Sequence, residues 1–145
     1  MVGPMSPATT LLGPVIVLAL WTHAIMLWMY VTRIPAIFAM KMEFDSDAIR
    51  GEQMSTLPAR VRWKADNFTH LTEQPTVFYA VVICLCLLDQ ATSLNVGLAW
   101  AYVGLRIVHS HVQVLGNHIP TRFTMFVLMS VVLIILTVNA AQAVF

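Results

Sequence analysis

Four long stretches of mostly apolar residues alternate with short polar segments along the chain. They cover about residues 10–40, 58–88, 94–115 and 120–144, and each can supply the roughly 20 apolar residues that a helix needs to cross a bilayer. The first stretch stays apolar as far as Met40, so we expect that helix to project past the lipid. The pattern predicts an all-α fold, a single domain built as a bundle of four transmembrane helices.

The polar segments between these helices predict one long loop and two turns. Residues 41–64 hold most of the charged side chains and predict a solvated loop, whereas residues 89–95 and 116–121 predict short turns between neighbouring helices. Pro58 and Pro120 stand where a helix is expected to begin, a position that suits proline because the first helical N–H groups have no partner within the helix.

The composition agrees with a protein that is mostly embedded in lipid. Hydrophobic residues make up 59% of the 145 residues and charged residues only 10%, against about 25% in soluble domains. The net charge of +1 excludes a nucleic-acid surface built on bulk positive charge. We therefore expect membrane lipids as partners, and no nucleic acid.

The basic residues predict the orientation of the chain in the membrane. When the four helices are threaded alternately through a bilayer, all eight fall on the side of the 41–64 loop or in the half of the membrane next to it: Arg33, Lys41, Arg50, Arg60, Arg62, Lys64, Arg106 and Arg122. The positive-inside rule then places the 41–64 loop in the cytoplasm and both termini outside. Residues 1–10 lack the basic segment of a cleavable signal peptide, so we expect the first helix to be retained.

Polar side chains within the predicted helices are the candidates for function. A charge at the bilayer centre costs at least about 2.5–3.5 kcal/mol, so Glu73 and Arg106 need partners or water. Helical spacing gathers further polar residues toward the cytoplasmic half of the bundle: Arg62, Asn67 and His70 on the second helix, His109 and Gln113 on the third, and Arg122 at the start of the fourth. Such a pocket suits an anionic, peptide-like ligand, because arginine binds carboxylates bidentately and Glu73 can accept an ammonium group.

Simpler interpretations of the same residues remain open. Glu73 and Arg106 can neutralise each other as a structural ion pair, and Arg60, Arg62 and Lys64 can act as anchors at the membrane interface. His70 and His109 can meet across two helices as in a bis-histidine haem site. We expect no metal site, because no span contains a His-x-x-x-His or Glu-x-x-His spacing.

Two motifs resemble those of the MAPEG family, the membrane-associated proteins of eicosanoid and glutathione metabolism. Residues 62–79 read RWKADNFTHLTEQPTVFY and are similar to the family's second helix, in which an arginine and an asparagine precede an acidic residue followed closely by Pro and Phe. Residues 106–113 read RIVHSHVQ and lead to Pro-Thr-Arg at 120–122, which resembles the microsomal glutathione transferases. The resemblance covers about residues 60–126.

The resemblance implies a homotrimer of four-helix subunits in which glutathione binds between neighbouring subunits. It implies that Arg62, Glu73 and Arg106 hold glutathione and that Arg122 is the catalytic arginine, which stabilises the thiolate. The thiolate would attack a lipophilic electrophile or reduce a lipid hydroperoxide. Bacterial-looking members of the family imply an inner-membrane location.

The chain departs from the family motifs at two positions. His70 stands where the family often has an asparagine, three residues before the acidic residue, and Gln113 stands where the better-known members have a glutathione-contacting tyrosine. Asn67, His70, His109 and Gln113 are therefore expected to complete the glutathione site with a changed set of contacts. The alternative is a non-catalytic lipid-binding or assembly protein of the same fold.

Overall fold

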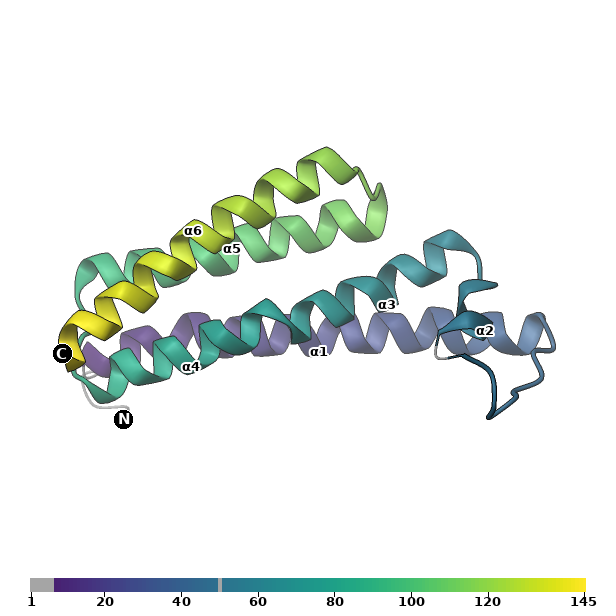
Figure 1. The fold of residues 1–145 in the computed structure, drawn as a ribbon, viewed down its shortest axis with the longest axis horizontal. Helices are drawn as coiled ribbons and strands as arrows, with labels where there is room; N and C mark the ends of the chain where they lie inside the picture. The colour runs from purple at the N-terminus through teal and green to yellow at the C-terminus, as the bar shows by residue number, and fades with distance from the viewer. Residues whose placement is uncertain (1–6, 50) are drawn as a thin grey trace, which may run out of the picture.

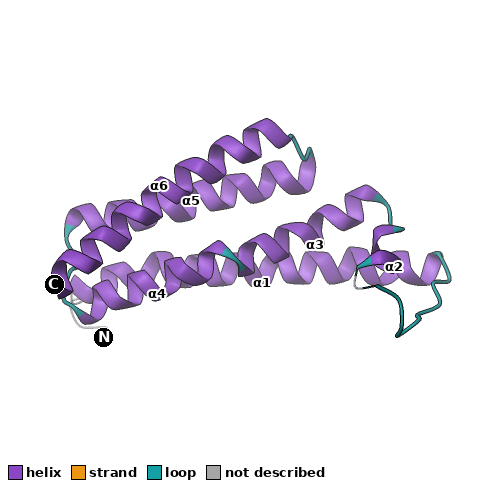
Figure 2. Cartoon of the chain, in the orientation of Figure 1, coloured by secondary structure: helices purple, strands orange, loops and turns teal. Residues whose placement is uncertain are grey.

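A computed structural model describes residues 7–49 and 51–145, so Arg50 and the N-terminal residues 1–6 lie outside the described part of the chain. Within that part the fold is entirely helical, as predicted (Figure 2). The helices are α1 (Pro7–Ala39), α2 (Glu52–Ser55), α3 (Ala59–Thr72), α4 (Gln74–Leu87), α5 (Ser93–Leu115) and α6 (Ile119–Val144).

Four long helical segments run alternately up and down, which confirms the predicted bundle (Figure 1). Helix α1 runs the full length of the molecule, and α3 and α4 return beside it, one after the other. Helices α5 and α6 form a hairpin against them. The end of α1 and the short α2 extend beyond the turn between α5 and α6.

The second predicted helix is divided at Glu73 into α3 and α4. Pro75 has no backbone N–H, and its ring clashes with the carbonyl of the residue four positions earlier, Leu71, so a regular helix cannot continue there. Glu73 accordingly has a non-helical ψ of −95°, and the backbone N–H of Thr76 donates to the Glu73 carbonyl over 3.1 Å. The break places the Glu73 side chain at the junction of two helices.

The apolar core lies where the four long segments meet. In α1 the fully buried Leu11, Leu18 and Ile25 recur every seven residues, which is two helical turns and therefore one face. In the centre of the bundle, Phe78 of α4 stacks on Tyr102 of α5 with ring centroids 4.4 Å apart and planes 9° apart. This packing holds α4 and α5 together near the helix break.

Hydrogen-bonded amides connect the helices at the end of the bundle where α6 finishes. The Asn139 side chain of α6 donates to the Asn95 side-chain oxygen of α5 over 2.7 Å, and Asn95 donates to the Gln90 carbonyl over 2.9 Å. Asn95 is buried, so these bonds replace the water that its amide would otherwise need. We call Gln90, Asn95 and Asn139 the amide clamp.

Three described segments are long and apolar enough to cross a membrane: Thr9–Ala39, Ala59–Leu87 and Ile119–Val144. Helix α5, the third predicted span, is not among them. Its buried residues include several polar side chains, which lower its hydropathy: Asn95, Arg106, His109, Ser110 and Gln113. Because these side chains are buried among α1, α3 and α6, α5 is the polar core of an otherwise apolar bundle.

Candidate functional site

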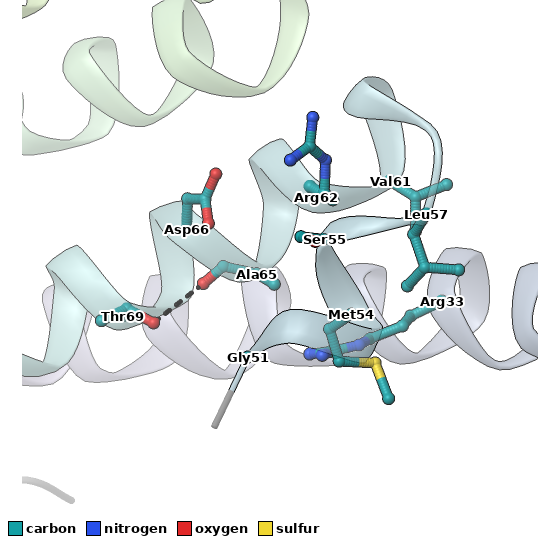
Figure 3. Close-up of a pocket in the computed structure, with 10 residues that line it drawn as sticks. All are labelled: Arg33, Gly51, Met54, Ser55, Leu57, Val61, Arg62, Ala65, Asp66 and Thr69. Atoms are coloured by element: carbon teal, nitrogen blue, oxygen red, sulfur yellow. Dashed lines mark hydrogen bonds between the residues drawn. The ribbon is translucent and has the colours of Figure 1, made fainter. Parts of the chain in front are cut away.

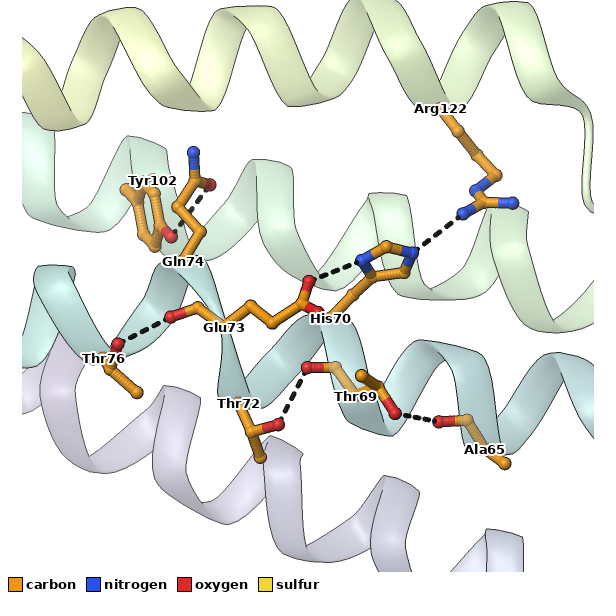
Figure 4. A network of polar contacts seen from close by, with 9 residues as sticks. All are labelled: Ala65, Thr69, His70, Thr72, Glu73, Gln74, Thr76, Tyr102 and Arg122. Carbon is orange, nitrogen blue, oxygen red and sulfur yellow. Dashed lines mark hydrogen bonds and ion pairs between the residues drawn. The ribbon is translucent and has the colours of Figure 1, made fainter. Parts of the chain in front are cut away.

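A chain of three polar side chains links α3, the helix break and α6 (Figure 4). His70 Nδ1 lies 3.1 Å from Glu73 Oε2, and His70 Nε2 lies 3.3 Å from Arg122 Nη2. A guanidinium group can only donate, so Nε2 is the acceptor and Nδ1 carries the proton that bonds to Glu73. The contacts therefore select one neutral tautomer of His70.

A pocket of about 380 Å³ opens beside this chain. Its polar wall consists of His70, His109 and Arg122, and its apolar wall of Ile119, Phe123 and Phe126. Ile119 and the two phenylalanines are largely exposed in the single chain. The pocket can therefore hold a polar group against imidazole and guanidinium while an apolar group lies on the aromatic rings.

Arg122 is held in this pocket by the turn that precedes α6. One terminal nitrogen donates to the side-chain oxygen of Asn117, and the other contacts His70. The Nε of Arg122 is buried and has no hydrogen-bond partner in the described structure. The guanidinium is thus positioned from two sides and keeps a donor that is not used.

A second group of predicted residues lies in the interior between α3 and α5. Asn67, Arg106, His109 and Gln113 are exposed by 0%, 1%, 3% and 1%. Ser110 donates to Asn67 Oδ1 over 3.1 Å, but six other side-chain atoms have no partner within the described residues: Asn67 Nδ2, Arg106 Nε and Nη2, His109 Nδ1, and both amide atoms of Gln113. Such groups are costly to bury unpaired, so this interior calls for water or a ligand.

The direct Glu73–Arg106 ion pair, one of the interpretations left open by the sequence, is absent from this structure. Glu73 instead accepts a hydrogen bond from the neutral imidazole of His70, and this is the contact within 4 Å that the described residues make between an acidic and a basic side chain. The reason is the helix break, which directs the carboxylate of Glu73 toward the imidazole on the preceding turn.

Arg62 lies apart from the other candidates, in a pocket between the end of α1, α2 and the start of α3 (Figure 3). This pocket of about 380 Å³ includes Arg33, Asp66 and Thr69 and shares no residue with the Arg122 pocket. Within one chain the predicted site is therefore split. Arg33, near the end of α1, was not among the residues predicted to bind glutathione, and it lines the pocket with Arg62.

Lys64 packs against the bundle, whereas its basic neighbours point outward. It is only 9% exposed, its ammonium donates to the Arg60 carbonyl over 2.7 Å, and it lies 5.3 Å from the ring centroid of Trp28 on α1. Arg60 and Arg62 are exposed, and the interpretation of all three as anchors at the membrane interface stays a prediction.

A further polar contact lies at the helix break. The amide oxygen of Gln74 accepts from the Tyr102 hydroxyl over 3.2 Å, and its nitrogen donates to Ser130 over 2.8 Å. Gln74 thus connects α4 to both α5 and α6, directly beside Glu73. Helical spacing places Gln74 on the same face as Asn67 and His70, but it could not give these two partners.

The haem alternative is not favoured by the histidine geometry. The rings of His70 and His109 are edge-to-face with centroids 6.4 Å apart, and both nitrogens of His70 are engaged by Glu73 and Arg122. The described residues also contain no group of three or more His, Cys, Asp or Glu side chains that could hold a metal ion.

Comparison with known proteins identifies the family of this bundle. No curated protein and no solved structure matches the chain. The family model described as "MAPEG family" matches residues 11–142, which run from near the start of α1 to near the end of α6. Since the match covers nearly the whole chain and agrees with its apolar helices, the chain belongs to the MAPEG family of integral membrane proteins.

Proposed function

We propose that the protein is a glutathione-dependent transferase or peroxidase that acts on lipophilic substrates, with Arg122 as its catalytic residue. The observation that carries this proposal is the pocket in which Arg122 faces apolar side chains. A thiolate near the guanidinium would be stabilised electrostatically, and a substrate dissolved in the membrane could approach along Phe123 and Phe126.

The glutathione thiolate can react with two classes of substrate. With an electrophilic carbon, the glutathione thiolate forms a thioether and the leaving group departs. With a lipid hydroperoxide, the thiolate takes the terminal oxygen and releases the lipid alcohol. The resulting sulfenic acid then reacts with a second glutathione to give the disulfide and water.

The interior between α3 and α5 supports a site for the peptide part of glutathione. Arg106 has unpartnered nitrogens that suit a carboxylate, and Asn67, His109 and Gln113 offer further unpartnered atoms. Glutathione has two carboxylates and one ammonium group, and Glu73 is the acidic candidate for the ammonium. A ligand reaching this interior would satisfy groups that the single chain leaves unpaired.

The outer surface of α3 supports a homotrimer. Arg62, Asp66, Thr69 and Glu73 are exposed along one stripe of a segment that is apolar enough to span a membrane. Polar side chains are expensive in contact with hydrocarbon, so a neighbouring subunit is the natural cover for this stripe. In this arrangement the Arg33–Arg62 pocket of one subunit would complete the Arg122 pocket of another.

We also propose that residues 41–64 face the cytoplasm and, as the family resemblance implies, that the protein lies in a bacterial inner membrane. The described basic residues lie in the half of the molecule that contains this loop or directly beside it.

A second candidate function is lipid binding without catalysis. The exposed apolar wall of the Arg122 pocket favours it, because Phe123 is 68% and Ile119 70% exposed in the single chain and an acyl chain could cover both. In this case the polar groups would serve to hold the subunits together.

A stability measurement with ligand distinguishes the two functions. We expect glutathione to raise the melting temperature of the detergent-purified protein, and Arg106→Ala to abolish that increase. Arg60→Ala is the matched control, because Arg60 is exposed at the start of α3. A protein that does not respond to glutathione but retains bound lipid would support the second function instead.

A further inference from the structure

His70 and Glu73 form an arrangement that goes beyond holding a ligand. We propose that His70, oriented by Glu73, is the general base that removes the proton from the bound thiol before Arg122 stabilises the thiolate. This inference rests on the proposed function and assigns the step that precedes nucleophilic attack. It concerns the position at which the chain has a histidine where the family motif often has an asparagine.

Glu73, His70 and the space beside Arg122 lie in a row, so that a carboxylate, an imidazole and a bound thiol would follow one another. Glu73 Oε2 accepts from His70 Nδ1 over 3.1 Å, which fixes the ring and leaves the lone pair of Nε2 directed toward Arg122 and the pocket. In such a pair the carboxylate holds the correct tautomer and stabilises the imidazolium that forms. Without a ligand the Nε2 lone pair accepts from Arg122, and it becomes available to a thiol proton when that guanidinium turns to the sulfur.

A ligand in the pocket can reach His70, because its side chain is partly exposed. The side chains of His70 and Glu73 are 40% and 60% exposed, and His70 lines the pocket together with Arg122. A thiol that entered between them would meet an acceptor on His70 and a donor on Arg122 at the same time. Placing a base and an electrostatic stabiliser on opposite sides of one S–H group is what its deprotonation requires.

The proposed step balances without another reactant. The S–H bond breaks, its electron pair remains on sulfur, and the proton forms a bond to His70 Nε2. The Arg122 hydrogen bond moves from Nε2 to the thiolate, since the protonated imidazole can no longer accept it. The thiolate then attacks the electrophile, and the imidazolium returns the proton to the leaving group or to the new alkoxide.

The groups that face His70 come from three elements. Glu73 Oε2 at the helix break lies 3.1 Å from Nδ1, Arg122 Nη2 on α6 lies 3.3 Å from Nε2, and the His109 ring on α5 is edge-on with its centroid 6.4 Å away. Transfer of the proton from a thiol to His70 forms a thiolate–imidazolium pair, in which Glu73 faces the imidazolium and Arg122 faces the thiolate.

The experiment follows thiolate formation and turnover as a function of pH. The absorbance of the bound thiolate in the ultraviolet and the kcat for an activated aryl chloride are measured with glutathione in the wild type, His70→Gln and Glu73→Gln. We expect His70→Gln to form thiolate only at higher pH and to lose about 10²-fold in kcat at pH 7, with a nearly unchanged KM for glutathione. Glu73→Gln should lose about 10-fold, and added imidazole should partly restore His70→Ala.

Matched controls come from exposed residues outside the pocket. His111→Gln changes a histidine on the opposite side of α5 that stacks on Trp21, and Glu43→Gln changes a loop carboxylate. If His70→Gln and Glu73→Gln both keep the wild-type pH dependence and kcat, the general-base role is rejected while glutathione use stands. If the wild type itself binds no glutathione and forms no thiolate at any pH, the proposed function fails as well. Should His70→Gln not fold, His70→Asn, which introduces the residue that the family motif often has at this position, carries the same decision.

Discussion

Ser110 on α5 donates its hydroxyl to the side-chain oxygen of Asn67 on α3 over 3.1 Å, and both side chains are completely buried. This bond crosses the polar interior in which Arg106 and Gln113 lack partners. It shows that α3 and α5 are held in register by a neutral hydrogen bond, while the charged group next to it remains available.

Ser110→Ala should destabilise the protein, because it leaves the Asn67 oxygen buried without a donor. We expect a loss of about 1 kcal/mol, near the upper part of the range for interhelical bonds in membranes. The melting temperature in detergent measures it. Ser93→Ala is the control, since Ser93 is exposed at the start of α5 and should change little. An equal effect of both variants would contradict the structural role of the bond.

Arg106→Met should raise the stability of the protein without ligand. Arg106 is 1% exposed, and two of its guanidinium nitrogens have no partner in the described chain, so a methionine of similar length removes an uncompensated charge. Replacing buried charges by apolar residues has stabilised other proteins by about 1–4 kcal/mol. Thermal unfolding without glutathione tests this, and Arg60→Met is the exposed control.

The same variant should lose the stabilisation that glutathione provides. A gain of stability together with a loss of the ligand response would show that Arg106 destabilises the empty protein and is needed to bind glutathione. A lower melting temperature of Arg106→Met in the absence of ligand would instead show that the assembled protein provides a counter-charge for Arg106.

Subunits that carry different defects should complement each other if the site lies between them. Arg62→Ala and Arg122→Ala each remove one side of the proposed shared site and should each be inactive. When the two are co-expressed, about a quarter of the sites would combine an intact Arg62 from one subunit with an intact Arg122 from its neighbour. Turnover near that fraction supports the shared site, whereas no recovery would place both arginines in sites within single subunits.

Labelling should show which side of the membrane each loop occupies. In a background with Cys84→Ala and Cys86→Ala, we expect Ser93→Cys to react with a membrane-impermeant maleimide in intact cells that lack the outer membrane. Glu43→Cys should react only after the membrane is opened, because the 41–64 loop is proposed to be cytoplasmic. The reverse pattern would invert the topology without affecting the fold.

The fold was largely predictable from the sequence because lipid imposes simple rules. Each long apolar run forms a helix, since every backbone group in hydrocarbon must be paired within its own segment. The break at Glu73 was not predicted, although Pro75 is a sufficient cause for it. The length of the 58–88 stretch, which suits one membrane span, favoured a single helix.

The candidate site was only partly predictable, because helical spacing gives the face of a residue and not its neighbours. The spacing placed His70, Glu73 and Arg122 in one half of the bundle, and the structure brings them into contact. It could not show that Glu73 would choose His70 over Arg106, which depends on the backbone at the break. Nor could it show the burial of Lys64, which depends on Trp28, a residue more than 30 positions away that packs against it from α1.

The amide clamp has a mechanical consequence for the far end of the bundle. Figure 1 shows α6 close to α4 near its C-terminal end and separating from α3 toward the α5–α6 turn. Arg122 stands 17 residues from Asn139, or about 25 Å along the helix axis, so a rotation of about 5° around the clamp displaces Arg122 by about 2 Å. The amide clamp is thus the point about which α6 would tilt, and the displacement grows along the helix toward Arg122. A tilt of this size would therefore change the Arg122–His70 distance while leaving the Asn95–Asn139 hydrogen bond in place.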